Sequence, residues 1–145
     1  MSLSRARDIS VSGIMAEKLH MELIASNMAN INTTKTQGGG PYKRVVPVYS
    51  QVPLSFEGQL AKAQQKIAQK TGGVLVKVAE DTATPLQKVY NPGHPDADLN
   101  GYVSLPNVSM ATEMTDLIYS SKLYEANITV FNATKKMGAD ALQIQ

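Results

Sequence analysis

Apolar residues in the N-terminal part of the chain follow a helical period. Between residues 5 and 32 there is no proline, and apolar positions recur at Val11, Ile14, Met21, Ile24, Met28 and Ile31. This spacing predicts a long amphipathic helix. With Ile9, Leu19 and Leu23 included, the apolar positions cover about 220° of the helical wheel, whereas a helix on one core needs a stripe of ~100°. A single partner cannot cover so wide an arc.

The C-terminal part carries two apolar seams on one predicted helix, from about residue 109 to residue 144. The first seam has alternating steps of four and three, which is heptad spacing, and consists of Met110, Met114, Leu117, Ser121, Tyr124, Ile128, Phe131, Lys135, Gly138 and Leu142. The second lies roughly 180° away on the wheel and consists of Leu123, Val130, Met137 and Ile144, preceded by Tyr119. We expect the first seam to pair with the N-terminal helix and the second to face another molecule.

The middle of the chain has the pattern of short strands and turns. Residues 42–48 and 74–79 are rich in β-branched residues and are bounded by Gly or Pro, and residues 87–90 are a third candidate strand. Residues 56–70 are rich in Gln, Lys and Ala with few apolar anchors, which fits either a marginal helix or a mobile insertion. Residues 91–95 and 100–101 have turn chemistry.

These patterns together predict an α+β fold. The terminal helices pair as an antiparallel coiled coil, and the middle region connects them. The expected divisions are an N-terminal helix in residues 1–36, a β-rich and loop region in residues 37–108 with the insertion at about 50–71, and a C-terminal helix in residues 109–145.

Composition excludes several classes of function. The 145 residues include 14 Lys+Arg dispersed among 12 Asp+Glu, so the net charge is only +2 and no basic patch for nucleic acid is expected. The absence of cysteine excludes disulfides and zinc–thiolate sites. No run approaches the ~20 apolar residues of a membrane span, and the N-terminus has no secretory signal pattern. We therefore expect neither nucleic-acid binding nor membrane insertion.

Catalytic or metal-binding chemistry has little support in the sequence. His94, Asp96 and Asp98 alternate through a turn and could converge on a divalent cation. Pro92 and Pro95 make a rigid turn a sufficient explanation for that segment. The other histidine, His20, lies on a predicted helix, and no nucleophile motif accompanies either histidine. The sequence predicts no enzyme activity, no cofactor and no metal.

Three motifs carry a resemblance to a known family. The first is ASNMANINT in residues 25–33, the second is PGHPDADLNGYVSLPNV in residues 92–108, and the third comprises Glu113-Met114, YEAN in residues 124–127 and NATKKM in residues 132–137. Their order and spacing resemble the flagellar rod, hook and axial protein family, over nearly the whole chain except residues 50–71. The second motif is typical of one rod subunit within that family.

The resemblance implies a structural subunit of the proximal rod of the bacterial basal body. Such a subunit polymerises helically in the periplasm, transmits motor torque, and leaves the cell through the flagellar type III export apparatus without a cleaved signal peptide. Its implied partners are copies of itself, other rod subunits, the basal-body adaptor and the export apparatus. The alternative is a soluble coiled-coil adaptor that forms a closed dimer.

The terminal helices are expected to supply the assembly interface. Small residues in the first motif would allow close helix approach, and Asn27 and Asn30 could bond to neighbouring backbone or side chains. For Asn30 the alternative of merely ending the helix is equally open, whereas the position of Asn27 on the apolar arc favours the interface. The predicted interface residues are Ile14, Met21, Ile24, Asn27, Met28 and Asn30 in the N-terminal helix, and Leu123, Tyr124, Asn127, Val130, Met137 and Ile144 in the C-terminal helix.

Overall fold

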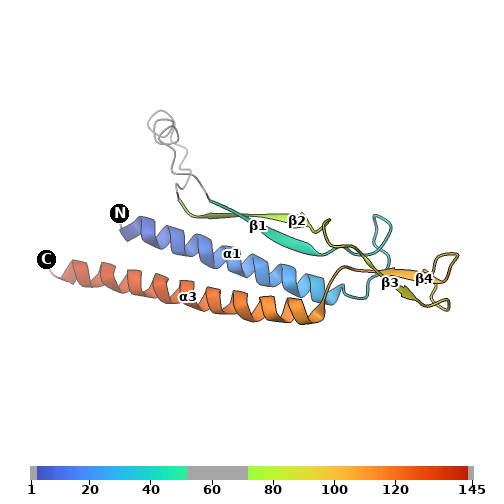
Figure 1. Cartoon of the computed structure of the whole chain (residues 1–145). Helices are drawn as coiled ribbons and strands as arrows, with labels where there is room; N and C mark the ends of the chain where they lie inside the picture. The colour runs from blue at the N-terminus through green and yellow to red at the C-terminus, as the bar shows by residue number, and fades with distance from the viewer. Residues whose placement is uncertain (1–2, 52–71, 144–145) are drawn as a thin grey trace, which may run out of the picture. The chain divides into compact units, whose positions relative to one another are not determined.

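A computed structural model describes residues 3–51 and 72–143 of the chain. Over these residues the element order is α1, β1, β2, β3, β4, α3, which confirms the predicted α+β class (Figure 1). The predicted insertion at residues 56–70 and the interface residue Ile144 lie outside the described residues. Neither described helix has the length and apolarity needed to cross a membrane.

Helix α1 spans Leu3–Ala29 and ends three residues before the predicted limit at residue 32. The physical reason is Asn30, whose backbone N–H and side-chain Nδ2 both donate to the carbonyl oxygen of Ser26, at 3.1 and 2.9 Å. An asparagine side chain that bonds to the preceding turn competes with helix continuation. The chain then turns through Gly39 and Gly40, which both have positive φ (79° and 78°).

Strands β1 (Val45–Gln51) and β2 (Val74–Glu80) form a two-stranded sheet. Strand β2 confirms the prediction, whereas β1 starts three residues later than residue 42. The backbone of residues 42–44 is held by loops instead, because Tyr42 N–H donates to the Thr33 carbonyl (3.0 Å) and Arg44 N–H donates to Asn107 Oδ1 (2.7 Å).

Strands β3 (Gln87–Tyr90) and β4 (Tyr102–Leu105) form a second, antiparallel sheet. Strand β3 has the predicted bounds, and β4 was not predicted. In the register of this sheet, Gln87 pairs with Leu105 and Tyr90 pairs with Tyr102. The rings of Tyr90 and Tyr102 meet edge to face, with 5.3 Å between their centroids. The connection needs Gly101, which has φ +80°; a Cβ there would lie 2.9 Å from Cε2 of Tyr90. This backbone conformation favours glycine.

Helix α3 spans Met110–Gln143, in agreement with the prediction. Ser109 precedes the first turn, and its carbonyl accepts the first helical hydrogen bond from Glu113 N–H at 2.9 Å. Pro106, just upstream, keeps the segment between β4 and α3 out of a helical conformation.

Contacts divide the chain into two compact units. Among the described residues, unit 1 contains residues 3–19, 48–51, 72–77 and 120–143, and unit 2 contains residues 20–47 and 78–119. Each unit therefore has a part of both helices and a part of the middle region. The interior of unit 1 is formed by Ser10, Ala16, Glu17, Ser120 and Thr134, and that of unit 2 by Ile24, Asn27, Val103, Pro106, Asn107, Val108 and Glu113.

Candidate assembly surface and the polar network beneath it

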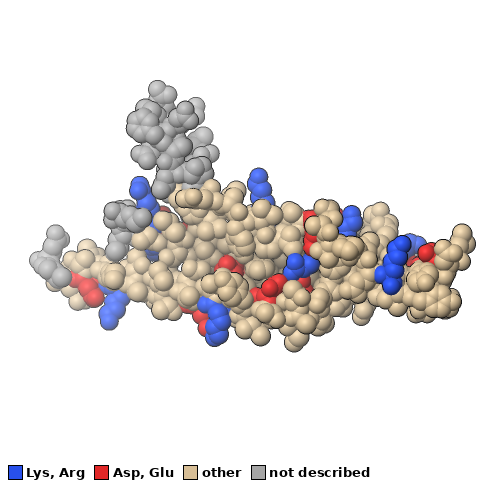
Figure 2. All heavy atoms as spheres, viewed as in Figure 1, with Lys and Arg blue, Asp and Glu red and all other residues tan. Residues whose placement is uncertain are grey.

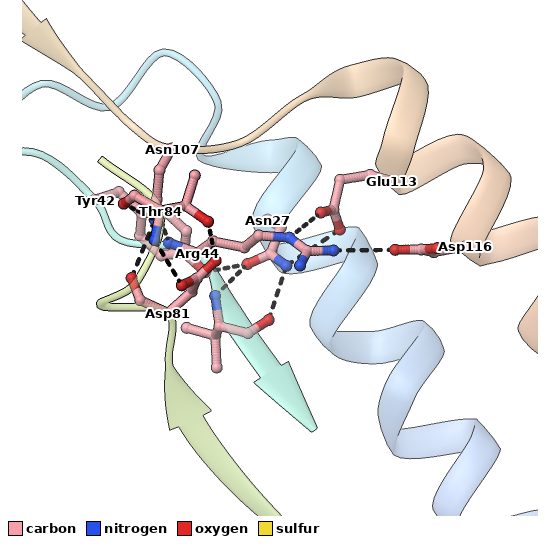
Figure 3. A network of polar contacts seen from close by, with 9 residues as sticks. Asn27, Tyr42, Arg44, Asp81, Thr84, Asn107, Glu113 and Asp116 are labelled. Carbon is pink, nitrogen blue, oxygen red and sulfur yellow. Dashed lines mark hydrogen bonds and ion pairs between the residues drawn. The ribbon is translucent and has the colours of Figure 1, made fainter. Parts of the chain in front are cut away.

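Asn27 is the centre of the interior of unit 2 and is 1% exposed. Its Nδ2 donates to the Val45 carbonyl (2.9 Å) and to Glu113 Oε2 (3.2 Å), and its Oδ1 accepts from Val45 N–H (2.9 Å) and from the Tyr42 hydroxyl (2.9 Å). These four bonds use both amide donors and both lone pairs. A single side chain thus joins α1 to β1 and α3 (Figure 3).

Arg44 supplies the positive charge of this network. Its Nε donates to Glu113 Oε1 at 2.5 Å and its Nη2 to Asp116 Oδ2 at 3.0 Å. Glu113 is 0% exposed, so its carboxylate depends on Arg44 and Asn27 for compensation. Partial burial by itself lowers the pKa of Arg44, but the hydrogen bond and charge of Glu113, together with Asp116, outweigh that effect and raise the pKa above its ordinary value. The guanidinium therefore remains charged.

Asn107 holds the backbone around this ion pair. It accepts from Arg44 N–H and donates from Nδ2 to the carbonyls of Asp81 (3.0 Å) and Thr84 (3.1 Å). The Asp81 carboxylate stabilises the turn that follows it, because Thr84 Oγ1 donates to this carboxylate at 2.7 Å. This bond and the backbone N–H of Thr84 lower the pKa of Asp81 below its ordinary value. None of the buried side-chain polar atoms of the described residues lacks a hydrogen-bond partner.

Polar and small side chains also lie between the helix segments of unit 1. Ser120 is fully buried and donates to Glu17 Oε2 at 2.7 Å. At Gly13, an added Cβ would lie 3.1 Å from Asn127 Nδ2, so the helix backbone approaches that side chain closely. As the residue number increases along α1 from Gly13 to Glu17, the neighbour on α3 moves back from Asn127 to Ser120. The two segments are therefore antiparallel.

Strand β2 is attached to α1 within unit 1 through Ser12. Its hydroxyl donates to the Ile9 carbonyl at 2.7 Å and accepts from Val74 N–H at 3.1 Å. The preceding residue, Gly73, has φ +128°, and a Cβ at this position would lie 2.7 Å from Ser12 Oγ. A residue larger than glycine would displace the strand from the helix.

The covered face of α3 differs from the first apolar seam predicted from the sequence. Met110, Met114, Lys135 and Leu142 are exposed, while the other members of that seam are half-buried. A second set of covered positions on α3 recurs every seven residues and is polar, namely Glu113, Ser120, Asn127 and Thr134. These positions alternate along the helix with Leu117, Tyr124 and Phe131. Four of the ten predicted seam positions are therefore exposed, because the prediction was built on apolar periodicity and the most deeply covered positions of α3 are polar. A search for polar residues in heptad spacing would have found the four polar positions.

Large apolar side chains lie mainly on the outside. Among the described residues the buried apolar side chains are few, namely Ala16, Ile24, Val103, Pro106 and Val108, whereas seven large ones on α3 alone are exposed. Those seven are Met110, Met114, Ile118, Tyr119, Val130, Met137 and Leu142. Exposed apolar surface of this extent is typical of an association surface.

The predicted interface residues fall into two groups. Ile24 and Asn27 are covered by residues of their own unit, so a second subunit could reach them only after that packing opened. Val130 (53%) and Met137 (63%) are exposed, and the remaining described members are half-buried: Ile14, Met21, Met28, Asn30, Leu123, Tyr124 and Asn127. Sequence reasoning also missed Arg44, which precedes a strand, carries no local signal and is 69 residues from Glu113.

The turn around His94 is ordered by internal hydrogen bonds. His94 Nδ1 accepts from Asp96 N–H (3.1 Å), and Asp98 Oδ1 accepts from Asn100 N–H (2.9 Å) and Tyr102 N–H (2.8 Å). Asp96 Oδ2 accepts from Thr34 Oγ1 at 2.8 Å. Within residues 3–51 and 72–143 no group of three or more acidic, His or Cys side chains converges as metal ligands would. The interactions support the rigid-turn interpretation.

Charged side chains are dispersed over the face shown in Figure 2, with Lys and Arg set singly among uncharged residues and acidic groups. Lys122 pairs with Glu125 at 2.9 Å and Lys43 with Glu80 at 3.7 Å. Such exposed pairs contribute little to stability. The features that distinguish the described part of this protein are several buried polar side chains and many exposed large apolar ones.

Comparison with known proteins adds to these observations. Residues 99–144 match the family model described as "Flagellar basal body rod FlgEFG protein C-terminal". The matched segment contains β4 and all of the described part of α3, and so includes Glu113, Ser120 and the exposed apolar positions. The match indicates the class of flagellar rod proteins.

Curated relatives identify the family more closely. The chain is 36% identical to the flagellar basal-body rod protein FlgC of Borreliella burgdorferi, with 99% of this chain and 98% of the relative covered. It is 35% identical to FlgC of Bacillus subtilis (99% of both chains) and 36% identical to FlgC of Salmonella typhimurium (94% and 93%). The chain belongs to the FlgC family of flagellar basal-body rod proteins. It is a structural subunit of the basal-body rod and not an enzyme.

Proposed function

We propose that this subunit polymerises helically through its terminal helices, in the proximal part of the rod. The observation that carries the proposal is the inverted arrangement of α3, in which Glu113 and Ser120 are fully buried while large apolar side chains are exposed. Fully burying a large apolar side chain contributes about 1.5–3 kcal/mol, and the apolar side chains concerned on α3 are 42–77% exposed, so each would contribute part of that in a contact. In the free chain these apolar side chains contact water, so this stabilisation is gained only when a neighbouring subunit buries them.

The terminal helices are proposed to form an antiparallel coiled coil within each subunit. The support is the antiparallel placement of Gly13 beside Asn127 and of Glu17 beside Ser120 in unit 1. Covered positions seven residues apart give the heptad spacing that such a pair requires. The proposed functional segments are residues 1–36, 37–108 and 109–145, with the first and last forming the core of the rod.

Two different faces are available for contacts between subunits. Ala25, Ser26 and Ala29 are exposed on α1 and are small, so another helix can approach the backbone closely there. The exposed side chains of α3, such as Val130 and Met137, are large and apolar. A contact between unlike faces is heterologous and generates an open helical polymer unless the rotation closes a ring. This supports a rod and argues against a closed dimer.

The family assignment supports the remaining parts of the proposal. A rod subunit of this family would act in the periplasm, transmit torque along the polymer, and reach its site through the flagellar export apparatus without a cleaved signal peptide. Its partners there would be copies of itself, other rod subunits and the basal-body adaptor. No nucleic acid or cofactor has a role in this function.

Charge substitutions on the exposed face of α3 test the proposal. Val130→Asp and Met137→Asp should each abolish motility and hook formation, while the variant proteins are still produced and secreted. A carboxylate at either position is harmless in solvent, but burying it unpaired in a contact between subunits costs several kcal/mol. The measurements are motility, hook counts by electron microscopy, and secreted protein by immunoblot.

Lys136→Asp is the matched control, since Lys136 is an exposed neighbour on the same helix and lies outside the apolar seam. It should reduce motility much less than either seam variant. Normal rods from both seam variants would show that this face makes no contact with a neighbouring subunit.

A mass measurement separates the rod from the closed-dimer alternative. Purified wild-type protein should form open-ended assemblies whose mass increases with concentration. A stable dimer whose mass does not change with concentration would support the adaptor instead.

A further inference from the structure

The ion pair between Arg44 and Glu113 joins three parts of unit 2 that are distant in the sequence. Glu113 is on α3, Asn27 is on α1, and Arg44 immediately precedes β1. Glu113 is 0% exposed and Asn27 is 1% exposed, so both groups depend entirely on protein partners. A charge and an amide are therefore buried among the helix segments of unit 2, beside the apolar side chain of Ile24.

A buried ion pair of this kind contributes little to net stability. The cost of removing a carboxylate and a guanidinium from water offsets much of their attraction, and apolar replacements of similar volume are often neutral or stabilising. The network has to be explained by something other than stability. A single buried polar residue in a helix pair is known to fix the register, because every other register leaves it unsatisfied.

Glu113 is placed so that its partners are available in one register only. The positions covered on α3, Glu113, Ser120, Asn127 and Thr134, repeat every seven residues with polar or small side chains. Such a repeat offers similar shapes after a slip of one heptad. Glu113 has two partners held by other elements, because Asn107 fixes the backbone of Arg44 at 2.7 Å and Val45 fixes the amide of Asn27 at 2.9 Å. Any slip removes Glu113 from both.

We propose that Asn27, Arg44 and Glu113 form a register key, which permits the segments of α1 and α3 in unit 2 to pair in one register only. The residues are specificity-determining positions of the subunit and do not themselves contact a neighbour. The role of the register key in the cell rests on the proposed assembly function. The test of the key itself uses the unassembled protein.

The test replaces the entire key with apolar side chains in the full-length protein, as Asn27→Leu, Arg44→Met and Glu113→Met together. The variant should still unfold cooperatively in urea, with a midpoint below that of the wild type because Val45 and Tyr42 lose the Asn27 amide as a partner. The δ1-methyl NMR signal of Ile24, which is buried in the same unit, should split from one signal into at least two, because several registers become populated. One Ile24 signal from a folded triple variant would overturn the proposal.

A conservative pair of variants decides the question if the triple variant does not fold. Glu113→Gln removes the buried charge, while Asp116→Asn removes a charge from the same Arg44 at a side chain that is 37% exposed. Splitting of the Ile24 signal is expected in Glu113→Gln only. A single signal in Glu113→Gln, or equal splitting in both variants, would contradict the register key.

The result is independent of the motility assay. If Val130→Asp rods assemble normally but the Ile24 signal splits in the triple variant, the register key holds and the assembly surface is wrong. If Val130→Asp blocks rod assembly but the folded triple variant gives a single Ile24 signal, the register key is wrong and the proposed assembly surface is retained.

Discussion

Asn27→Ala should destabilise the protein far more than Asn30→Ala, although both asparagines belong to the same segment at the end of α1. Asn27 makes four hydrogen bonds from a site with 1% exposure. Its removal leaves the N–H and C=O of Val45, the Tyr42 hydroxyl and one oxygen of Glu113 without that partner. Each unsatisfied buried group costs about 1–3 kcal/mol, and water can reach some of these groups, so the expected loss is roughly 2–4 kcal/mol.

Asn30 is the control because its amide makes two bonds from a half-buried site, whereas Asn27 is 1% exposed. Its Nδ2 donates to the Ser26 carbonyl at 2.9 Å and its Oδ1 accepts from Thr33 Oγ1 at 3.1 Å. Water replaces both bonds after substitution, so Asn30→Ala should cost about 1 kcal/mol or less.

The assay is equilibrium urea unfolding of the monomeric chain, followed by far-ultraviolet circular dichroism and by tyrosine fluorescence. With a slope of about 2 kcal/mol/M, a loss of about 3 kcal/mol lowers the midpoint by about 1.5 M. Asn27→Asp should be worse than Asn27→Ala, because it replaces the donor facing Glu113 Oε2, 3.2 Å away, with a second negative charge. Equal midpoints for Asn27→Ala and Asn30→Ala would refute the reasoning.

Two further outcomes follow from the local geometry. Gly101→Ala should lower the stability of the β3–β4 sheet by about 1–2 kcal/mol, because φ is +80° there and the new methyl meets Tyr90. Gly93→Ala should be nearly silent in the same urea assay, because a Cβ there makes only an ordinary contact with Asn91 Oδ1 at 3.8 Å. Partial burial and the neighbouring Glu17 carboxylate raise the pKa of Tyr49 to about 12, so spectrophotometric titration should show a tyrosine that ionises well above pH 10. The stability of the protein should fall as pH rises from about 10 to 12, because the folded state holds that proton more tightly than the unfolded state. A titration in which all tyrosines ionise together near pH 10 would contradict this assignment.

Several features of the protein were determined by the sequence itself. The lengths of α1 and α3 follow from proline-free stretches with helical periodicity, since these properties act within a few residues. The turn chemistry of residues 91–101 is likewise local, and so are the bounds of β3. The motifs in residues 25–33 and 92–108 were sufficient to indicate the family, because they record residue identity rather than conformation.

Only the tertiary structure decided which face of each helix lies inside. Apolar periodicity points to a core in most soluble proteins, but here the inner positions of α3 are Glu113, Ser120 and Thr134, while Val130 and Met137 are exposed. A pattern of apolar residues identifies surfaces that avoid water and does not state whether the same chain or a neighbour covers them. Strand β4 and the role of Arg44 were hidden for a related reason. Each depends on a partner far away in the sequence, and a buried charge can be recognised as satisfied only when the fold brings its counter-charge within hydrogen-bond distance.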